Sequence, residues 1–138
     1  MSIAVDSGAC DNVIGPDDIP EYRECIKETP DSLRGGCFVS ASGEEIPNFG
    51  EVTLPLVTRE HGIKAVKFQA AGVAKPLLSA ERLNQAGHYV IFDGDDSCIV
   101  NKNTYDVTAL RREDGNFMLD VWIPPVAVSR KVGFVGQP

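Results

Sequence analysis

Prolines and glycines recur along the whole chain, and this punctuation restricts the fold more than any other feature. The 138 residues contain 9 prolines and 13 glycines, spread so that they divide the chain into short segments. Proline interrupts both helices and central strands, and glycine and proline together mark turns. The pattern predicts a mainly β fold of short strands joined by tight turns.

Composition narrows the class of protein further. The chain is 43% hydrophobic and 24% charged, which is typical of a folded globular domain, and its length suits one such domain. The net charge of −7 makes nucleic acid a poor partner. No apolar run approaches the length of a membrane-spanning helix, and Asp6 follows the N-terminus too soon for a secretory signal. We therefore expect no membrane association and an intracellular, cytoplasmic location.

The metal-binding residue types are scattered. The spacing of the four cysteines matches no zinc motif, and the two histidines lie far apart in the sequence (Cys10, Cys25, Cys37, Cys98, His61 and His88). We expect no metal site and no cofactor. In an intracellular setting the cysteines are expected to be reduced, buried thiols.

Local patterns predict a specific order of elements. A short strand over 3–5 is followed by a polar, turn-rich surface excursion over 15–36, with one helical turn near 22–26. The clearest element is a helix over 80–86, with Ser79 as N-cap and Gly87 just past its end. The remaining expectations are a hairpin of 38–41 with 45–49, strands at 51–57 and 63–69, and a meander of 89–92, 97–100, 106–111 and 117–123. Residues 1–125 form the predicted domain, and 126–138 a tail or linker.

The triplet Asp6-Ser7-Gly8 is the strongest candidate in the sequence for a catalytic site. It follows an apolar strand directly, so a carboxylate stands at the start of a tight turn. Glycine allows close approach of another backbone, and the serine hydroxyl can form hydrogen bonds across a narrow gap. Taken alone, such a triplet is more typical of an ordinary turn than of a catalytic site.

Three segments in order give the triplet a context. They are Val5-Asp6-Ser7-Gly8-Ala9-Cys10-Asp11-Asn12-Val13-Ile14, then Val39-Ser40-Ala41-Ser42-Gly43 with Gly50-Glu51-Val52-Thr53-Leu54, then Leu77-Leu78-Ser79-Ala80-Glu81-Arg82-Leu83-Asn84-Gln85-Ala86-Gly87-His88. This order resembles the retropepsin-like aspartic proteases, and most closely the protease domain of copia-type retrotransposon polyproteins. The resemblance spans about residues 3–93. Ser79 departs from the glycine of retroviral relatives, but copia-type elements share that serine.

The resemblance implies a closed retropepsin-like (acid protease) β-barrel with one short helix near residues 80–86. It implies that Asp6, Ser7 and Gly8 form the catalytic turn, and that the hairpin around Ser42-Gly43 is a flap that closes over substrate. It also implies that an extended peptide contacts Ala9, Ala41, Ser42, Gly43, Leu77 and Leu78.

Hydrolysis by this route needs two carboxylates that share one proton, one acting as general base on water and the other as acid. The chain holds a single Asp-Ser-Gly, and the turn dipeptides Asp93-Gly94 and Asp114-Gly115 lack the intervening serine. The second carboxylate must then be Asp6 of another copy, which predicts a homodimer. The apolar segment 117–123 is a candidate for core packing or, alternatively, for the dimer interface.

The implied function is an aspartic endopeptidase of a retroelement polyprotein, acting in the cytoplasm or inside a retroelement particle. The alternative is a retropepsin-like module without activity that serves dimerisation or peptide binding. The sequence leaves the cleavage specificity and the natural substrate open.

Overall fold

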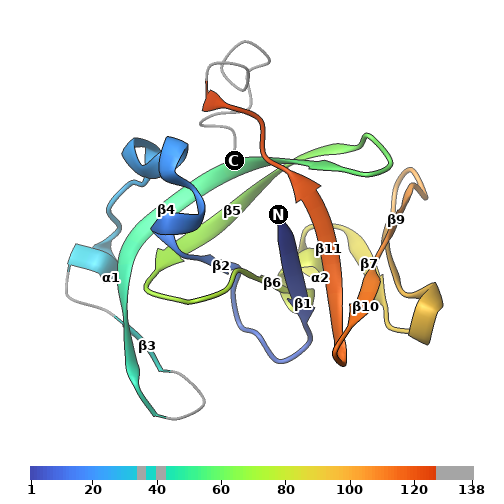
Figure 1. The fold of residues 1–138 in the computed structure, drawn as a ribbon, viewed down its shortest axis with the longest axis horizontal. Helices are drawn as coiled ribbons and strands as arrows, with labels where there is room; N and C mark the ends of the chain where they lie inside the picture. The colour runs from blue at the N-terminus through green and yellow to red at the C-terminus, as the bar shows by residue number, and fades with distance from the viewer. Residues whose placement is uncertain (34–36, 40–42, 127–138) are drawn as a thin grey trace.

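The computed structural model describes residues 1–33, 37–39 and 43–126 of the chain and is mainly β (Figure 1). The β prediction is confirmed at this level. The strands are β1 (Ser2–Asp6), β2 (Val13–Ile14), β3 (Cys37–Val39), β4 (Glu45–Thr58), β5 (Ile63–Ala71), β6 (Leu77–Ser79), β7 (His88–Ile91), β8 (Cys98–Asn101), β9 (Val107–Ala109), β10 (Arg111–Glu113) and β11 (Asn116–Trp122). The helices are α1 (Pro30–Leu33) and α2 (Ala80–Gln85), with 3₁₀ turns at Pro16–Asp18, Pro20–Cys25 and Gly94–Asp96.

An eight-stranded sheet in the order β10-β11-β1-β6-β2-β5-β4-β3 forms the body of the molecule. The end of β11 also pairs with the end of β4, where Val121 faces Thr58 and Trp122 faces Val57. Hydrogen-bonded pairing therefore runs from β11 through β1, β6, β2, β5 and β4 and back to β11. The long β4–β5 hairpin curves across one side of this arrangement (Figure 1).

β1 lies at the centre of the sheet and ends at Asp6. It pairs antiparallel with β11, with Val5 opposite Phe117, and parallel with β6, with Asp6 opposite Ser79. The alternating Ile3 and Val5 are buried, as expected for a strand with one face in the core. Burial of these side chains fixes the register, and the register places Asp6 at the end of this interior strand, opposite Ser79 of β6.

The prediction that the strands after the helix form one continuous meander is wrong. β7, β8 and β9 form a separate three-stranded sheet, whereas β10 and β11 join the large sheet. Within β11, Leu119 and Val121 are buried and strands pair along both edges. The segment 117–123 therefore contributes to the core, the first of its two expected roles.

The predicted hairpin around Gly43 is present. β3 pairs antiparallel with the start of β4, with Phe38 opposite Ile46, and Gly43 has a φ of 83°, which glycine adopts without strain. A bulge between Asn48 and Gly50 interrupts the β4–β5 register. The predicted substrate-contacting residues Ala41 and Ser42 lie outside the described residues.

The excursion over 15–36 is not confined to the surface, which corrects the prediction. Ile19 and Tyr22 are buried, and the Tyr22 hydroxyl donates a 2.6 Å hydrogen bond to the Pro124 carbonyl oxygen. The single expected helical turn is also too few, because two 3₁₀ turns and α1 occupy this stretch. A tyrosine in a polar run gives no local sign that a distant segment covers it.

The predicted helix is confirmed as α2. The Ser79 hydroxyl oxygen accepts a hydrogen bond from the Arg82 amide, and Gly87 has a φ of 94° just past the helix end. The predicted tail over 126–138 lies, apart from Val126, outside the described part of the chain. Among the helices that the structure describes, none is long and apolar enough to cross a membrane.

Candidate functional site

The Asp6 turn, residues 6–9, starts where β1 ends. The Oδ1 atom of Asp6 accepts a 2.7 Å hydrogen bond from the Gly8 amide, and the Ala9 amide lies 3.4 Å from the Asp6 carbonyl oxygen. An aspartate that accepts from the amide two residues on closes a tight turn. Asp6, Ser7 and Gly8 are all exposed, so the remaining carboxylate oxygen is open to solvent or a ligand.

Two buried polar side chains, Ser79 and Asn12, hold the turn from behind; we call them the Ser79–Asn12 brace. The Ser79 hydroxyl donates to the Ala9 carbonyl oxygen at 2.7 Å while it caps α2. The Asn12 amide oxygen accepts from the Ser79 backbone amide at 2.9 Å, and its nitrogen donates to the Lys67 carbonyl at 3.1 Å. The brace thus ties the turn to α2, β6 and β5, and it gives Ser79 a role that glycine lacks.

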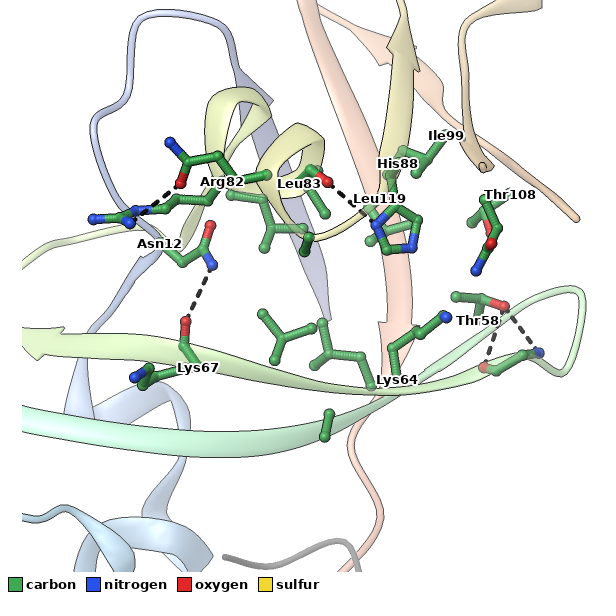
Figure 2. A pocket seen from close by; sticks show the side chains of 18 of the residues that line it. Asn12, Thr58, Lys64, Lys67, Arg82, Leu83, His88, Ile99, Thr108 and Leu119 are labelled. Atoms are coloured by element: carbon green, nitrogen blue, oxygen red, sulfur yellow. Dashed lines mark hydrogen bonds between the residues drawn. The ribbon is translucent and has the colours of Figure 1, made fainter. Parts of the chain in front are cut away.

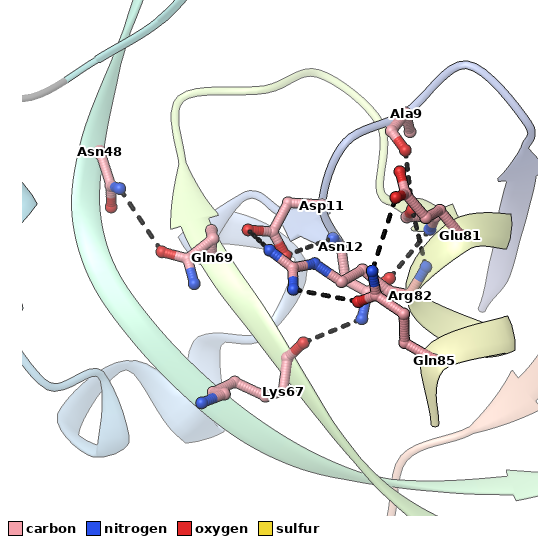
Figure 3. Close-up of polar contacts among 10 residues, drawn as sticks. Ala9, Asp11, Asn12, Asn48, Lys67, Gln69, Glu81, Arg82 and Gln85 are labelled. Atoms are coloured by element: carbon pink, nitrogen blue, oxygen red, sulfur yellow. Dashed lines mark hydrogen bonds and ion pairs between the residues drawn. The ribbon is translucent and has the colours of Figure 1, made fainter. Parts of the chain in front are cut away.

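A second set of polar contacts extends outward from the brace (Figure 3). The Arg82 guanidinium lies 3.5 Å from Asp11 Oδ2, and both side chains are partly exposed. Asp11 also accepts a 2.9 Å hydrogen bond from the Asn12 amide. Asp11 therefore neighbours the turn as a supporting residue, and its carboxylate is already engaged.

A pocket of about 380 Å³ opens beside Asp6. The apolar side chains of Leu77 from β6, Phe92 after β7 and Phe117 from β11 line part of this pocket. The polar Ser7 also lines it. The rings of Phe92 and Phe117 pack with centroids 4.8 Å apart. An exposed carboxylate next to a pocket that includes apolar side chains can act on a polar group of a ligand whose side chain the pocket holds.

The structure brings only some of the predicted site residues together. Asp6, Ser7 and Leu77 share the pocket, and Gly8 and the half-buried Ala9 continue the same turn. Leu78, next along β6, is buried and lines a different cavity, because neighbouring strand residues point to opposite faces. Gly43 lies in the hairpin between β3 and β4 and lines neither this pocket nor the other cavity.

Phe92, Asn116 and Phe117 line the pocket but were not among the predicted site residues. Asn116 and Phe117 reach Asp6 through the antiparallel pairing of β1 with β11, a contact across more than a hundred residues, and Phe92 reaches it by packing on Phe117. Nothing in the local pattern around them indicates this pairing. The only available signal is the apolar character of the segment 117–123.

At the opposite end of β1, an ionic cluster fixes the strand's start. Hydrogen bonds from the Arg111 side chain and the Ser2 hydroxyl lower the pKa of Asp120 to about 2, and nearby positive charge on Arg111 and Arg59 adds to the effect. The Arg111 guanidinium donates to both Asp120 carboxylate oxygens, at 2.9 and 3.0 Å. Bidentate geometry of this kind makes the pair stronger than a single contact.

The described residues were also compared with the expectations for metal ligands and cysteines. No group of three or more His, Cys, Asp or Glu side chains in these residues could hold a metal ion. Cys10, next to the Asp6 turn, is exposed, and Cys25 and Cys98 are half-buried, so the expectation of buried thiols is wrong for these three.

Comparison of the chain with family models, with curated proteins and with solved structures found no match.

Proposed function

We propose that this chain is a retropepsin-like aspartic endopeptidase domain of a retroelement polyprotein. The observation that carries the proposal is the exposed Asp6 carboxylate at the end of β1, in a tight Asp-Ser-Gly turn that is braced from β6 and α2. The order of β1, turn, β2, hairpin, β6 and α2 agrees with the order of segments on which the resemblance depends.

In this proposal Asp6 supplies half of the catalytic site. A second carboxylate within about 3 Å must share its proton, so that one acts as base on the attacking water and the other protonates the leaving nitrogen. Among the residues that the structure describes, no carboxylate other than that of Asp6 lines this pocket. The twin Asp6 of a homodimer supplies the missing group, and both turns must be exposed, as Asp6, Ser7 and Gly8 are.

The finer fold assignment follows from the same proposal. Pairing of β11 with both β1 and β4 is what a closed barrel requires, since it leaves those edges of the sheet joined. The β3–β4 hairpin takes the part of a flap. An extended peptide between hairpin and turn would bind through its backbone, with Leu77, Phe92 and Phe117 receiving one side chain.

Replacement of Asp6 tests the proposal. We expect Asp6→Asn to lower the rate of peptide cleavage at acidic pH by at least about 100-fold, because general acid–base catalysis contributes at least that much. The exposed Asp18→Asn serves as the matched control and keeps the parent rate. Cleavage of a peptide library is measured with and without a transition-state-mimicking inhibitor of aspartic proteases. Equal rates for Asp6→Asn and the parent protein contradict the proposal.

A binding module without catalysis is the alternative function. The pocket beside Asp6 holds one carboxylate and an apolar wall, which is sufficient for binding a peptide and insufficient for cleaving it. Sedimentation at micromolar concentrations separates the two functions. A strict monomer that binds peptides favours the module, whereas a dimer that cleaves them favours the enzyme.

A further inference from the structure

Figure 2 shows a second, larger cavity of about 590 Å³, which is lined by Leu78 of β6, whereas the neighbouring Leu77 lines the Asp6 pocket. Its walls come from β5, α2 and the inner face of the β7–β9 sheet, and its floor from buried leucines of the large sheet, Leu56, Leu78 and Leu119. This volume is in the range of small-molecule sites, which are mostly apolar with a few placed polar groups. Asp6 does not line this cavity, although Asn12 of the brace and Leu78 do.

The polar groups at the cavity's rim are unusual for this protein. The chain carries a net charge of −7, yet two residues with cationic side chains, Lys64 and Arg82, line the cavity, whereas Lys67 faces Asn12 with its backbone carbonyl oxygen and its side chain points away (Figure 2). Two carboxylates, Asp11 and Asp106, also line it, and Asp11 already pairs with Arg82. Lys64 lies on β5, across the cavity from Leu83 of α2 (Figure 2).

His88 lines one end of the cavity, and its protonation depends on the charges around it. Its Nδ1 lies 3.2 Å from the Leu83 carbonyl oxygen, which can only accept, so Nδ1 carries a proton and Nε2 is the titrating nitrogen. Partial burial lowers the pKa of His88, with nearby charge on Lys64 and Lys102 adding to the effect. In Figure 2 His88 and Lys64 extend toward the same end of the cavity. A negative charge placed there would be attracted by Lys64 and would favour protonation of Nε2.

We propose that this cavity binds an apolar carboxylate about the size of a medium-chain fatty acid. The alkyl chain would lie on the leucine floor, where it removes apolar surface from water. The carboxylate would lie at the end of the cavity lined by Lys64 and His88. This site is separate from Asp6 and does not depend on the proposed protease function.

Binding of decanoate to the full chain tests the proposal, with decanol as a probe of equal tail and no charge. We expect decanoate to shift the methyl NMR signals of Leu78, Leu83 and Leu119 saturably and to raise the pKa of His88, whereas decanol binds more weakly and leaves that pKa unchanged. Lys64→Gln should weaken decanoate binding about fivefold, as removal of one exposed ion pair does, and leave decanol binding unchanged. Lys75→Gln, an exposed lysine outside the cavity, should change neither.

Several outcomes overturn the proposal. Absence of saturable shifts shows that the cavity takes no such ligand. Equal affinity for decanoate and decanol, or an unchanged affinity in Lys64→Gln, shows that the charged groups recognise no carboxylate. Loss of decanoate binding as the protein concentration rises, with methyl shifts that then occur without ligand, shows that a second copy of the chain covers the cavity. Circular dichroism of Lys64→Gln confirms that any loss of binding is not a loss of fold.

Discussion

The Asp6 turn and the Ser79–Asn12 brace lie next to each other and differ in almost every physical respect. Asp6, Ser7 and Gly8 are exposed, and a side-chain hydrogen bond joins the Asp6 carboxylate to the Gly8 amide. Ser79 and Asn12 are buried, and their side chains make four hydrogen bonds that reach the turn, α2, β6 and β5.

This difference separates reactivity from stability. A carboxylate that meets substrate must stay accessible, and an accessible group contributes little to the folding free energy. Buried polar groups are costly to leave unpaired, so a satisfied buried pair holds the backbone in one conformation. Substitutions in the turn should therefore change activity, and substitutions in the brace should change stability first.

The largest effect on stability is expected from Asn12→Ala. It leaves the Ser79 amide and the Lys67 carbonyl without their side-chain partners in a buried place, and we expect a loss of about 3 kcal/mol in the free energy of unfolding. Urea denaturation measures it. Asn84→Ala, which removes one exposed hydrogen bond to the His88 carbonyl, is the control and should cost less than about 1 kcal/mol. Similar losses for both variants would remove the distinction between brace and surface.

Ser79→Ala should have a smaller effect, about 2 kcal/mol, because it removes the N-cap of α2 and the hydrogen bond to Ala9 while the backbone amide keeps its partner Asn12. Thermal unfolding and the helical circular dichroism signal measure the two losses together. Ser79→Thr, which retains the hydroxyl, is the comparison variant. If Ser79→Ala is as stable as the parent, the brace does not hold the turn.

In the turn itself, Gly8→Ala should change activity and leave stability within about 0.5 kcal/mol. A Cβ atom at residue 8 would lie 3.3 Å from Asp6 Oδ1, so the carboxylate must move by a few tenths of an ångström. We expect a roughly tenfold loss in kcat, since a small misplacement of a reacting group is costly. Gly62→Ala meets a side-chain oxygen of Thr58 at the same 3.3 Å, far from Asp6, and should keep full activity.

The smallest effect concerns the far end of β1. The pKa of Asp120 is lowered from 3.8 to about 2. A folded-state pKa below the unfolded value stabilises the fold above about pH 4, and this contribution is lost as the pH falls toward about 2. Asp120→Asn should therefore lower the free energy of unfolding by about 1 kcal/mol at pH 7 and by less at pH 2.

The control for this prediction is Asp17→Asn, whose partner Arg23 forms an ion pair between highly exposed side chains. We expect its effect to stay below about 0.5 kcal/mol at both pH values. A pH-independent effect of Asp120→Asn would show that the cluster acts through packing alone.

Features that depend on neighbouring residues were predictable from the sequence. Ser79 as N-cap and Gly87 past the helix end define α2 within about one turn, because capping is a local hydrogen-bonding requirement. The β3–β4 hairpin follows from the turn at Gly43 for the same reason. The tight turn at Asp6 is likewise a property of a few consecutive residues.

Features that depend on distant contacts were missed. The short β6 was visible only as an apolar pair, and its parallel pairing with β1 has no local signature. Burial of Tyr22 depends on Pro124, about a hundred residues away. β7, β8 and β9 form one sheet, whereas β10 and β11 join the other, and this division depends on tertiary packing that no short segment specifies.

The sequence by itself determined a mainly β chain with one capped helix and a single Asp-Ser-Gly turn, because turns, caps and strand alternation depend on consecutive residues. Only the tertiary structure decided what surrounds that aspartate: Leu77, Phe92 and Phe117 as its pocket, and Asn12 with Ser79 as its support. These residues meet because burial of apolar faces fixes the strand register, and register brings together side chains that are remote in the chain.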